Sequence, residues 1–441
     1  MRGGGPEVTD SDSAGTPSGR PGEKGRGAAP KGTGTGRRRR RWLRWTATGV
    51  AVVVLGAVAA GWAVYEKLNG NIKADEDAAA ELARYEKERP TALVRGAQNI
   101  LLIGSDSRSG AGNGKYGRDS GTERSDTTIL LHLAADRHSA TAMSLPRDLM
   151  VDVPGCRRPD GTRTRPMLAM FNHAFEVGGS ACTIRTVERL TDIRVDHHMV
   201  VDFHGFKDMV DAVDGVEVCL KKPIHDKAAK LNLPAGKVVL DGEQALGYVR
   251  ARKSIGNGSD TDRMDRQQKF LGALIGKVRS DDVLLNPAKL YPVLDAATSS
   301  LTTDPGLASL RGLYDLVRGM RDIPTEHIRF LTVPRTSYVL DPNRDQLVEP
   351  DAARLFARLR ADEPVAVAER PRAARNGSPH SVNLYGNGSY GNSPYGNSPR
   401  DHEEESGGDG MSTAIGVALL SGTPDPAPTF RGNTAAQDAC G

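Results

Sequence analysis

The folded core begins with the stretch Asn99-Ile-Leu-Leu-Ile-Gly-Ser-Asp-Ser-Arg108. Its apolar residues Ile100–Ile103 stand in a row before a glycine, which is the pattern of a short buried strand. Asp106 follows at the point where this strand would end, so its side chain can enter a cleft. Two further strand patterns come next, over Thr127–Leu133 and Ala140–Leu145. The core therefore opens as a sheet.

Helical patterns alternate with strand patterns after this point. Helices are expected over 181–190, 206–213, 242–249, 262–278, 307–321 and 351–359, and further strands over 149–153, 198–203, 216–220 and 328–333. Such alternation predicts an α/β fold in which helices are layered around one sheet. Residues 107–125, rich in glycine and charge, are expected to form a long loop.

Segments of different composition flank this core. Residues 66–97 are expected to be a stalk, since Ile72–Arg89 favours a helix but is charged on most faces. Residues 385–399 repeat a Tyr-Gly-Asn pentamer three times. Such a repeat cannot bury a core, so we expect a low-complexity tail over 365–441 and a folded domain over 98–364.

One stretch is long and apolar enough to cross a membrane. Trp45–Tyr65 carries no charge and would form a helix of roughly 32 Å. The arginines 37–41 precede it, which predicts a cytoplasmic N-terminus, a disordered basic tail over 1–44 and an extracytoplasmic core. A cleaved signal peptide is the alternative, because Ala57-Val58-Ala59 resembles a cleavage site, but the apolar run continues past it.

The charge distribution argues against a nucleic-acid-binding protein. The 441 residues carry a net charge of +4, but residues 1–44 alone hold 11 Lys or Arg against 4 Asp or Glu. The rest of the chain is therefore slightly acidic and has no basic face. A multi-span membrane protein is also excluded, since there is only one long apolar stretch.

Four cysteines fit an exported domain. Cys156 and Cys182 flank one loop rich in Pro, Gly and Arg, and we favour a disulfide between them. Cys219 lies in an apolar run and is equally compatible with a buried thiol, and the pairing of Cys219 and Cys440 stays open. The chain has no Cys-x-x-Cys, which argues against a zinc or thioredoxin-type site.

Three histidines, at positions 197, 198 and 204, invite a metal interpretation that we reject. Neighbouring residues on a strand point to opposite faces, so His197 and His198 cannot easily share an ion. A pair of carboxylates is the better metal candidate. Asp106 and Asp126 lie at the ends of adjacent strands, where they could hold a hard cation such as Mg²⁺ together with substrate phosphate oxygens. The simpler alternative is that each aspartate caps a turn.

Arginines follow the core elements at points where they can meet a phosphate. Arg147 comes directly after the strand pattern 140–145. Arg250 and Arg252 are two apart in extended chain and so point the same way. Arginine is suited to bidentate phosphate binding, although solvated surface charge is the alternative in a chain with 59 Lys and Arg.

The helix expected over 262–278 adds polar residues to the same set. Arg263 and Gln267 are four apart and share one of its faces. Asp260 lies just before the helix, where it could cap its N-terminus.

Motifs that span residues 99–278 resemble, as an ordered set, the LytR–CpsA–Psr family. In chain order they are Asn99-Ile-Leu-Leu-Ile-Gly-Ser-Asp-Ser-Arg108, Arg124-Ser-Asp-Thr-Thr, Ser144-Leu-Pro-Arg-Asp148, Asn172-His-Ala-Phe with Gly178-Gly179, Val201-Asp-Phe-x-Gly-Phe206, Asp214-Gly-Val-Glu-Val, Leu233-Pro-Ala-Gly, Leu240-Asp-Gly-Glu-Gln-Ala-Leu246, Tyr248-Val-Arg-Ala-Arg252 and Asp260-x-x-Arg263-x-x-Arg266-Gln267-Gln268.

The resemblance implies an α/β fold with a mixed central sheet in a membrane-anchored, Mg²⁺-dependent phosphotransferase, with Mn²⁺ as an alternative ion. Such an enzyme transfers a wall glycopolymer, for example wall teichoic acid, from a polyprenyl-pyrophosphate carrier to a sugar hydroxyl of peptidoglycan. The matching positions are Asp106 and Asp126 for the metal-associated carboxylates, Arg147, Arg250, Arg252, Arg263 and Gln267 for pyrophosphate binding, and Asp260 for an acidic residue of the same cleft. Asp106 and Asp260 are the candidates for the general base.

One position departs from the family pattern. Met170 stands where members often carry a lysine, so a phosphate contact is lost or is supplied by another basic group such as Arg165 or Lys253. Two other functions remain to be distinguished from transfer. One is a phosphatase that uses water as the acceptor, and the other is a non-catalytic lipid-binding or wall-scaffold protein.

Overall fold

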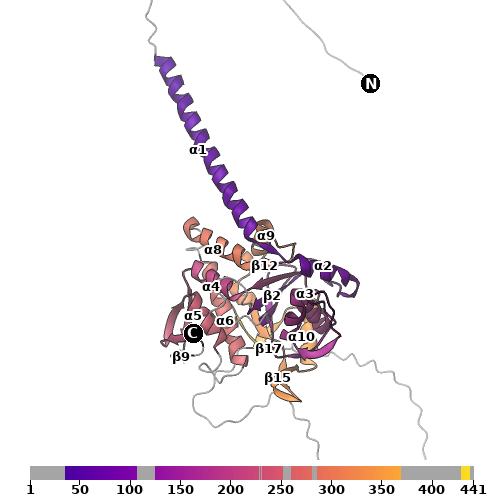
Figure 1. The fold of residues 1–441 in the computed structure, drawn as a ribbon. Coiled ribbons are helices and arrows are strands. Elements are labelled where there is room, and N and C mark those ends of the chain that lie inside the picture. Colours follow the sequence, from indigo (N-terminus) through magenta and orange to yellow (C-terminus); the bar gives the residue numbers. More distant parts are fainter. Residues whose placement is uncertain are drawn as a thin grey trace, which may run out of the picture. The chain divides into compact units, whose positions relative to one another are not determined.

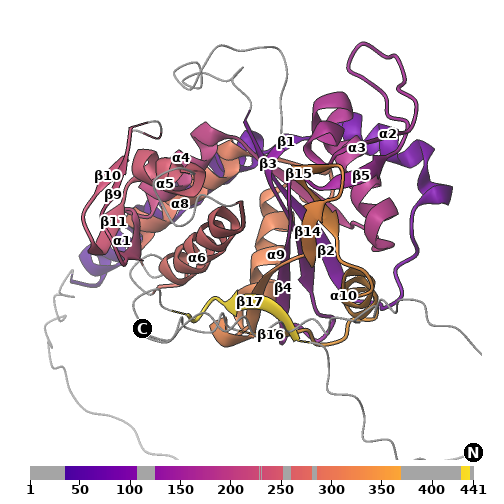
Figure 2. The same cartoon turned by 90° about the horizontal axis from the view of Figure 1, so that it is seen from below.

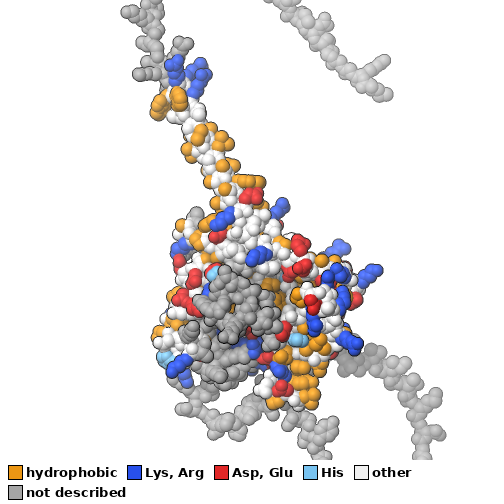
Figure 3. Space-filling view, in the orientation of Figure 1, with side chains coloured by type: hydrophobic (Ala, Val, Ile, Leu, Met, Phe, Trp, Pro, Cys, Tyr) orange, Lys and Arg blue, Asp and Glu red, His pale blue; other side chains and the backbone are white. Residues whose placement is uncertain are grey.

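The computed structural model describes residues 35–106, 125–227, 229, 231–251, 260–280, 286–368 and 429–437. The chain divides into two units, Met1–Ala63 and Val64–Gly441. In the first unit, the described residues belong to helix α1 (Thr35–Asn71), which continues into the second unit. Residues Arg40–Asn71 are long and apolar enough to cross a membrane by length and composition. Figure 3 shows apolar side chains along this helix and arginines at its N-terminal end.

A nine-stranded mixed sheet organises the second unit (Figures 1 and 2), and the predicted α/β fold is confirmed. The strands, in spatial order, are β1 (Lys73–Ala74), β12 (Leu301–Thr303), β7 (His197–Val201), β2 (Gln98–Ser105), β3 (Ser125–Leu133), β4 (Ala140–Leu145), β13 (Ile328–Thr332), β17 (Thr429–Thr434) and β16 (Ala366–Ala368). The central strands β2, β3 and β4 are antiparallel, and β7 and β13 are added parallel on either side.

Helices and small hairpins complete the unit. The helices are α2 (Glu76–Arg84), α3 (Asn172–Thr191), α4 (Phe203–Ala212), α5 (Gly242–Arg250), α6 (Asp260–Val278), α8 (Pro287–Ser300), α9 (Leu310–Arg321) and α10 (Asp351–Arg360), with short 3₁₀ turns at Glu86–Glu88 and Thr325–His327. Two-stranded sheets are formed by β5 (Met150–Val153) with β6 (Met167–Met170), β8 (Val216–Leu220) with β11 (Gly236–Leu240), β9 (Ile224–Asp226) with β10 (Leu231–Leu233), and β14 (Arg335–Tyr338) with β15 (Asp341–Leu347).

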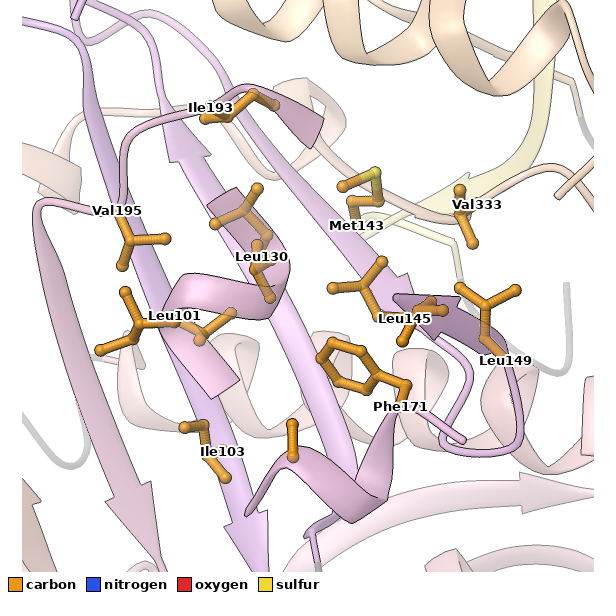
Figure 4. Packing of buried hydrophobic residues seen from close by; sticks show 14 of the residues in the cluster. Leu101, Ile103, Leu130, Met143, Leu145, Leu149, Phe171, Ile193, Val195 and Val333 are labelled. Carbon is orange, nitrogen blue, oxygen red and sulfur yellow. The ribbon is translucent and has the colours of Figure 1, made fainter. Parts of the chain in front are cut away.

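The apolar run that begins the core is buried on both faces of the sheet. Alternate residues of a strand point to opposite faces. Leu101 and Ile103 accordingly pack in one cluster with residues of α2, α3 and α10, and Figure 4 shows both side chains within it. Ile100 packs in a second cluster with residues of α6 and α9. Both faces of β2 are therefore covered, which explains why its sequence is a continuous apolar run.

Residues 66–97 form part of the domain and replace the stalk that we expected. Strand β1 pairs with β12 at the edge of the main sheet, and α2 packs against α3. Arg89 makes three hydrogen bonds of 2.8–3.1 Å to the buried carboxylate of Glu188 on α3 and one of 2.6 Å to the carbonyl of Val195. The charges of this segment suggested an exposed stalk. Arg89, however, is paired with Glu188, about a hundred residues away in the sequence, so the charge does not indicate exposure.

The expected tail over 365–441 also contributes two strands. Strand β17 pairs antiparallel with β13, and β16 pairs parallel with β17. Phe430 of β17 is buried in the same cluster as α3 and α10. The boundary at 364 is thus too early for these two segments, whereas the pentamer repeat over 385–399 lies outside the described residues.

The two adjacent histidines of β7 bind different carboxylates, as expected for side chains on opposite faces. His197 Nδ1 lies 3.1 Å from Asp304, and His198 Nε2 lies 3.1 Å from Asp75, which caps α2. The hydrogen bond with Asp304 raises the pKa of His197. Burial would raise the pKa of Asp304, but the His197 contact lowers it below its ordinary value.

A stability that depends on pH follows from the His197–Asp304 pair. Because the folded-state pKa of His197 is raised, its contribution is fully present below about pH 6.5 and is lost as the pH rises through the folded pKa. A hydrogen bond to a charged group contributes about 1.5–3 kcal/mol. The variant His197→Gln should therefore melt well below the wild type at pH 6 and close to it at pH 9. His138→Gln, at a side chain that is 82% exposed, is the control and should show no such divergence.

Candidate functional site

The two predicted carboxylates lie at neighbouring strand ends. Ser105, the last residue of β2, pairs with Ser125, the first residue of β3. Asp106 directly follows the one strand, and Asp126 is the second residue of the other. A bulge between Gly104 and Ser105 shifts the register at this end. Antiparallel pairing places the end of β2 beside the start of β3, so both aspartates lie at the same end of the sheet, as the sequence predicted.

Arg147 lies at the same end of the sheet, because β4 pairs antiparallel with β3 and ends at Leu145. Its Nη1 lies 2.7 Å from Asp126 Oδ1, and its Nε lies 3.3 Å from Asp148 Oδ2. The Arg147 carbonyl accepts a hydrogen bond of 3.0 Å from the amide of Asn172, at the start of α3. These contacts hold the guanidinium, 20% exposed, at the end of the sheet.

A second arginine, which the sequence patterns did not predict, lies beside Asp148. Arg344 of β15 lies 3.8 Å from Asp148 and also donates to the sulfur of Met170. The amide of Asp345 donates to the Asp148 carbonyl at 3.0 Å, which fixes the β14–β15 hairpin against this segment. No motif marks Arg344, because its position depends on a hairpin whose sequence does not alternate between apolar and polar residues.

Arg344 is thus the basic side chain that contacts Met170. Arg165 and Lys253 are the candidates that the sequence offers for a cation in place of the lysine that family members often carry there. Arg165 is exposed, and Lys253 lies outside the described residues.

Helices α5 and α6 carry the other predicted residues. Arg250 is the last residue of α5, and its guanidinium lies over the ring of Phe203, 4.3 Å from the centroid. Gln267 of α6 donates to the Val249 carbonyl at 3.2 Å. Arg266, also on α6, donates to the Ala251 carbonyl. The carbonyls at the C-terminal end of α5 are thus satisfied by side chains of α6, which fixes the end of α5 that bears Arg250.

Helix α6 also reaches the end of β4. Gln268 donates to the hydroxyls of Ser144, at 3.0 Å, and Thr332, at 3.1 Å. Ser144 is three residues before Arg147, and Arg263, buried in α6, is one turn before Gln267. Gln268 therefore connects the helix that carries Arg263 and Gln267 to the strand that leads to Arg147. Gln268 belongs to the last of the family motifs, but its position in the sequence alone does not indicate this role.

Two predicted residues cannot be assigned a geometry. Arg252 and the side chain of Asp260 lie outside the described part of the structure. Asp260 is the first residue of α6. It therefore does not precede the helix, as a residue that caps the N-terminus would.

A disulfide connects two of the segments near Arg147. Cys156 and Cys182 are joined, as the loop argument favoured, with their Cα atoms 5.6 Å apart. Cys182 lies in α3, the helix whose first residue, Asn172, holds the Arg147 carbonyl. Cys219 is also disulfide-bonded, which removes the buried-thiol alternative, whereas Cys440 lies outside the described residues.

A model of the LytR_cpsA_psr family matches residues 67–360, two thirds of the chain. The chain belongs to this family. The LytR–CpsA–Psr match begins at Lys67, which agrees with the packing of residues 66–97 into the domain. It also extends well beyond the motifs over 99–278 and includes the hairpin that carries Arg344.

Curated LytR–CpsA–Psr relatives carry names from cell-wall synthesis. The probable cell wall biosynthesis protein LcpB of Corynebacterium glutamicum is 34% identical over 62% of this chain and 63% of its own length. The polyisoprenyl-teichoic acid–peptidoglycan teichoic acid transferase TagT of Bacillus subtilis is 31% identical over 65% of this chain and 85% of its own length. This chain thus spans less than two thirds of the length of LcpB, and the same is true of the related LcpA.

The fold is also found in a solved structure. Protein gbs0355 of Streptococcus agalactiae has a TM-score of 0.51 and 25% sequence identity, and the match covers 60% of this chain and 87% of that protein. The match therefore shows that this chain shares its fold with a solved protein.

Proposed function

We propose that this chain is a membrane-anchored phosphotransferase that moves an anionic glycopolymer from a polyprenyl-pyrophosphate carrier to a sugar hydroxyl of peptidoglycan. The observation that carries the proposal is the position of Arg147. It is ion-paired to Asp126 at the end of the sheet where Asp106 follows β2. TagT, which aligns over most of its own length, is named a polyisoprenyl-teichoic acid–peptidoglycan teichoic acid transferase, and this name supports the proposal.

The proposed reaction exchanges one phosphorus–oxygen bond for another. The acceptor hydroxyl oxygen attacks the phosphorus that bears the polymer, and the bond from this phosphorus to the oxygen of the prenyl phosphate breaks. The hydroxyl proton passes to a carboxylate, for which Asp106 and Asp260 are the candidates, and polyprenyl phosphate leaves. Arg147, Arg250 and Arg263 would stabilise the charge that develops on the phosphate oxygens, and alignment of the two oxygens provides most of the remaining rate enhancement.

A divalent cation fits the carboxylates at the sheet edge. Mg²⁺ in such sites is usually held by one or two carboxylates and by the phosphates of the substrate. The described residues contain no group of three or more His, Cys, Asp or Glu that could hold an ion without substrate. Asp106 and Asp126 would hold Mg²⁺, or Mn²⁺ in its place, and the ion would neutralise charge on the pyrophosphate. Chelation should then abolish turnover, and either ion should restore it.

The proposed location is the outer face of the cell membrane. Helix α1 would anchor the chain, and the arginines at its start would keep the N-terminus in the cytoplasm. The Cys156–Cys182 disulfide supports this orientation, because disulfides persist in oxidising, exported compartments.

The proposal is tested with the full-length chain in lipid nanodiscs, a polyprenyl-pyrophosphate-linked oligosaccharide and soluble peptidoglycan fragments. Mass spectrometry should find the oligosaccharide joined to peptidoglycan by a phosphodiester, with one polyprenyl phosphate released per bond formed. Free oligosaccharide phosphate without a joined product would instead establish a phosphatase. Binding of the lipid without any turnover would establish a scaffold or lipid-binding protein.

A modest loss of activity is expected when Arg344 is replaced, because Arg344 contacts one oxygen of Asp148 and Arg147 contacts the other. The variant Arg344→Gln removes one of two cations from Asp148, and partly exposed ion pairs contribute up to about 1 kcal/mol. We expect kcat/KM of transfer to fall about fivefold, mainly through KM, because Arg147 keeps its contact with Asp126. Arg354→Gln on α10, which removes an exposed pair with Asp351, should leave both constants unchanged. Equal effects of the two variants would contradict the role of Arg344.

A further inference from the structure

Two helices of the domain enclose the residues that follow the apolar span. Lys67 Nζ lies 2.8 Å from the hydroxyl of Tyr291 and 3.1 Å from Asp295, both on α8. Asn71 donates to the same Asp295 at 3.0 Å. Asn69 accepts a hydrogen bond of 3.0 Å from the amide of Leu310, the first residue of α9. The start of α9 is therefore fixed to residue 69 of the chain.

This attachment limits the distance between α9 and a bilayer. The apolar span ends at Tyr65, four residues before Asn69, and the chain between them is helical. Four helical residues advance about 6 Å. The polar headgroup layer on one side of a bilayer is about 5–8 Å thick. The Asn69 side chain and its hydrogen bond to Leu310 add a few ångströms, so the start of α9 lies within the headgroup layer or just outside it, whatever angle the span adopts.

The outward face of α9 has the composition of an interfacial helix. Leu316 is buried against the sheet, whereas Tyr314 and Val317 are each 60% exposed. Arg318 and Arg321 lie one turn from these two residues and are also exposed, as is Arg311. Tyrosine favours the boundary between lipid and water, and arginine binds phosphate with paired N–H donors. The helix carries three arginines and one acidic residue, Asp315, so its charge complements an anionic lipid surface.

We infer that α9 lies on the bilayer that holds α1, with Tyr314 and Val317 in the headgroup layer and Arg318 and Arg321 on lipid phosphates. The occupant of this face is a membrane surface that contains anionic phospholipid. Contact at α9 in addition to the covalent connection at α1 would fix the orientation of the domain on the membrane. The inference rests on membrane anchoring by α1 and does not depend on transfer activity.

The test uses nitroxide probes on the full-length chain, reconstituted one copy per nanodisc so that a second copy cannot cover α9. The probe is attached at Val317→Cys, and the control probe at Val339→Cys, which is 77% exposed in the β14–β15 turn. In nanodiscs that contain phosphatidylglycerol, the probe at 317 should be protected from a water-soluble nickel chelate and accessible to oxygen, whereas the probe at 339 should be accessible to the chelate. Equal chelate access at both positions would overturn the inference.

A charge variant separates lipid contact from burial within the protein. Each arginine near an anionic surface contributes about 1 kcal/mol, so Arg318→Glu with Arg321→Glu should lower the equilibrium constant for docking at least about twenty-fold. The protection at 317 should then be lost in anionic nanodiscs. Protection that survives this change, or that persists in detergent without phospholipid, would show that protein and not lipid covers α9. Both readouts are independent of turnover, so a failed transfer assay would leave this inference standing.

Discussion

Replacement of Arg147 by alanine is expected to reduce the rate of transfer by about 10²–10³-fold while the domain stays folded. The side chain holds Asp126 at 2.7 Å and Asp148 at 3.3 Å, and it is 20% exposed, so its loss leaves two carboxylates close to the phosphates of the substrate. Both the lost cation and the added repulsion act on the charge that develops in the transition state. The rate of phosphodiester formation in nanodiscs is the measurement, with near-UV circular dichroism to verify the fold.

Two further variants define what Arg147 does. Arg147→Lys keeps the charge but not the planar fork of donors, so it should recover only part of the rate. Arg194→Ala, which removes an exposed ion pair with Glu86, should retain full activity. Arg252→Ala is expected to resemble Arg147→Ala, since the family resemblance gives both residues the same role. Normal transfer by both alanine variants would refute the proposed site.

The largest loss of stability is expected for Arg89→Ala. Arg89 and Glu188 are 11% and 3% exposed, and the Glu188 carboxylate has one further hydrogen bond, of 3.0 Å, from the Val195 amide. Removal of one partner from a buried ion pair costs about 3–5 kcal/mol, because the remaining charge is left without compensation. The midpoint of thermal unfolding should fall accordingly.

The remaining charge can be removed separately. Arg89→Ala combined with Glu188→Gln should be more stable than Arg89→Ala alone, since a neutral amide is less costly to bury than a carboxylate. Arg194→Ala removes an exposed pair with Glu86, which lies on the same segment as Arg89, and should cost less than about 1 kcal/mol. If Arg89→Ala and Arg194→Ala have the same midpoint of thermal unfolding, the Arg89–Glu188 pair does not hold residues 66–97 to α3.

Local patterns were sufficient for the central strands and for most helices. The run Ile100–Ile103 predicted β2 because it is buried on both faces, and the amphipathic stretch 262–278 predicted most of α6. The aspartates of the site followed from the same reasoning, since a residue just beyond a strand lies at the edge of the sheet. These predictions depend only on neighbours in the sequence.

Elements that depend on distant partners were missed. The segment 66–97 is held through Arg89 and Asp75, whose partners Glu188 and His198 cannot be read from local periodicity. Strand β17, with the sequence Thr-Phe-Arg-Gly-Asn-Thr, has few apolar residues and joins the sheet through backbone pairing with β13. Arg344 likewise reaches Asp148 only because its hairpin docks there.

The parallel pairing of β16 with β17 has a topological consequence for the sixty residues 369–428 between them. Both ends of this segment are fastened side by side in one sheet, so it is a closed excursion of the chain and not a free end. The entropic cost of bringing the two ends together grows only with the logarithm of the number of residues between them, so doubling that number would cost about 0.6 kcal/mol. The length of chain between β16 and β17 can therefore change at little expense to the pairing of the two strands. Cleavage of one peptide bond between β16 and β17 would leave β17 hydrogen-bonded to β13 and β16.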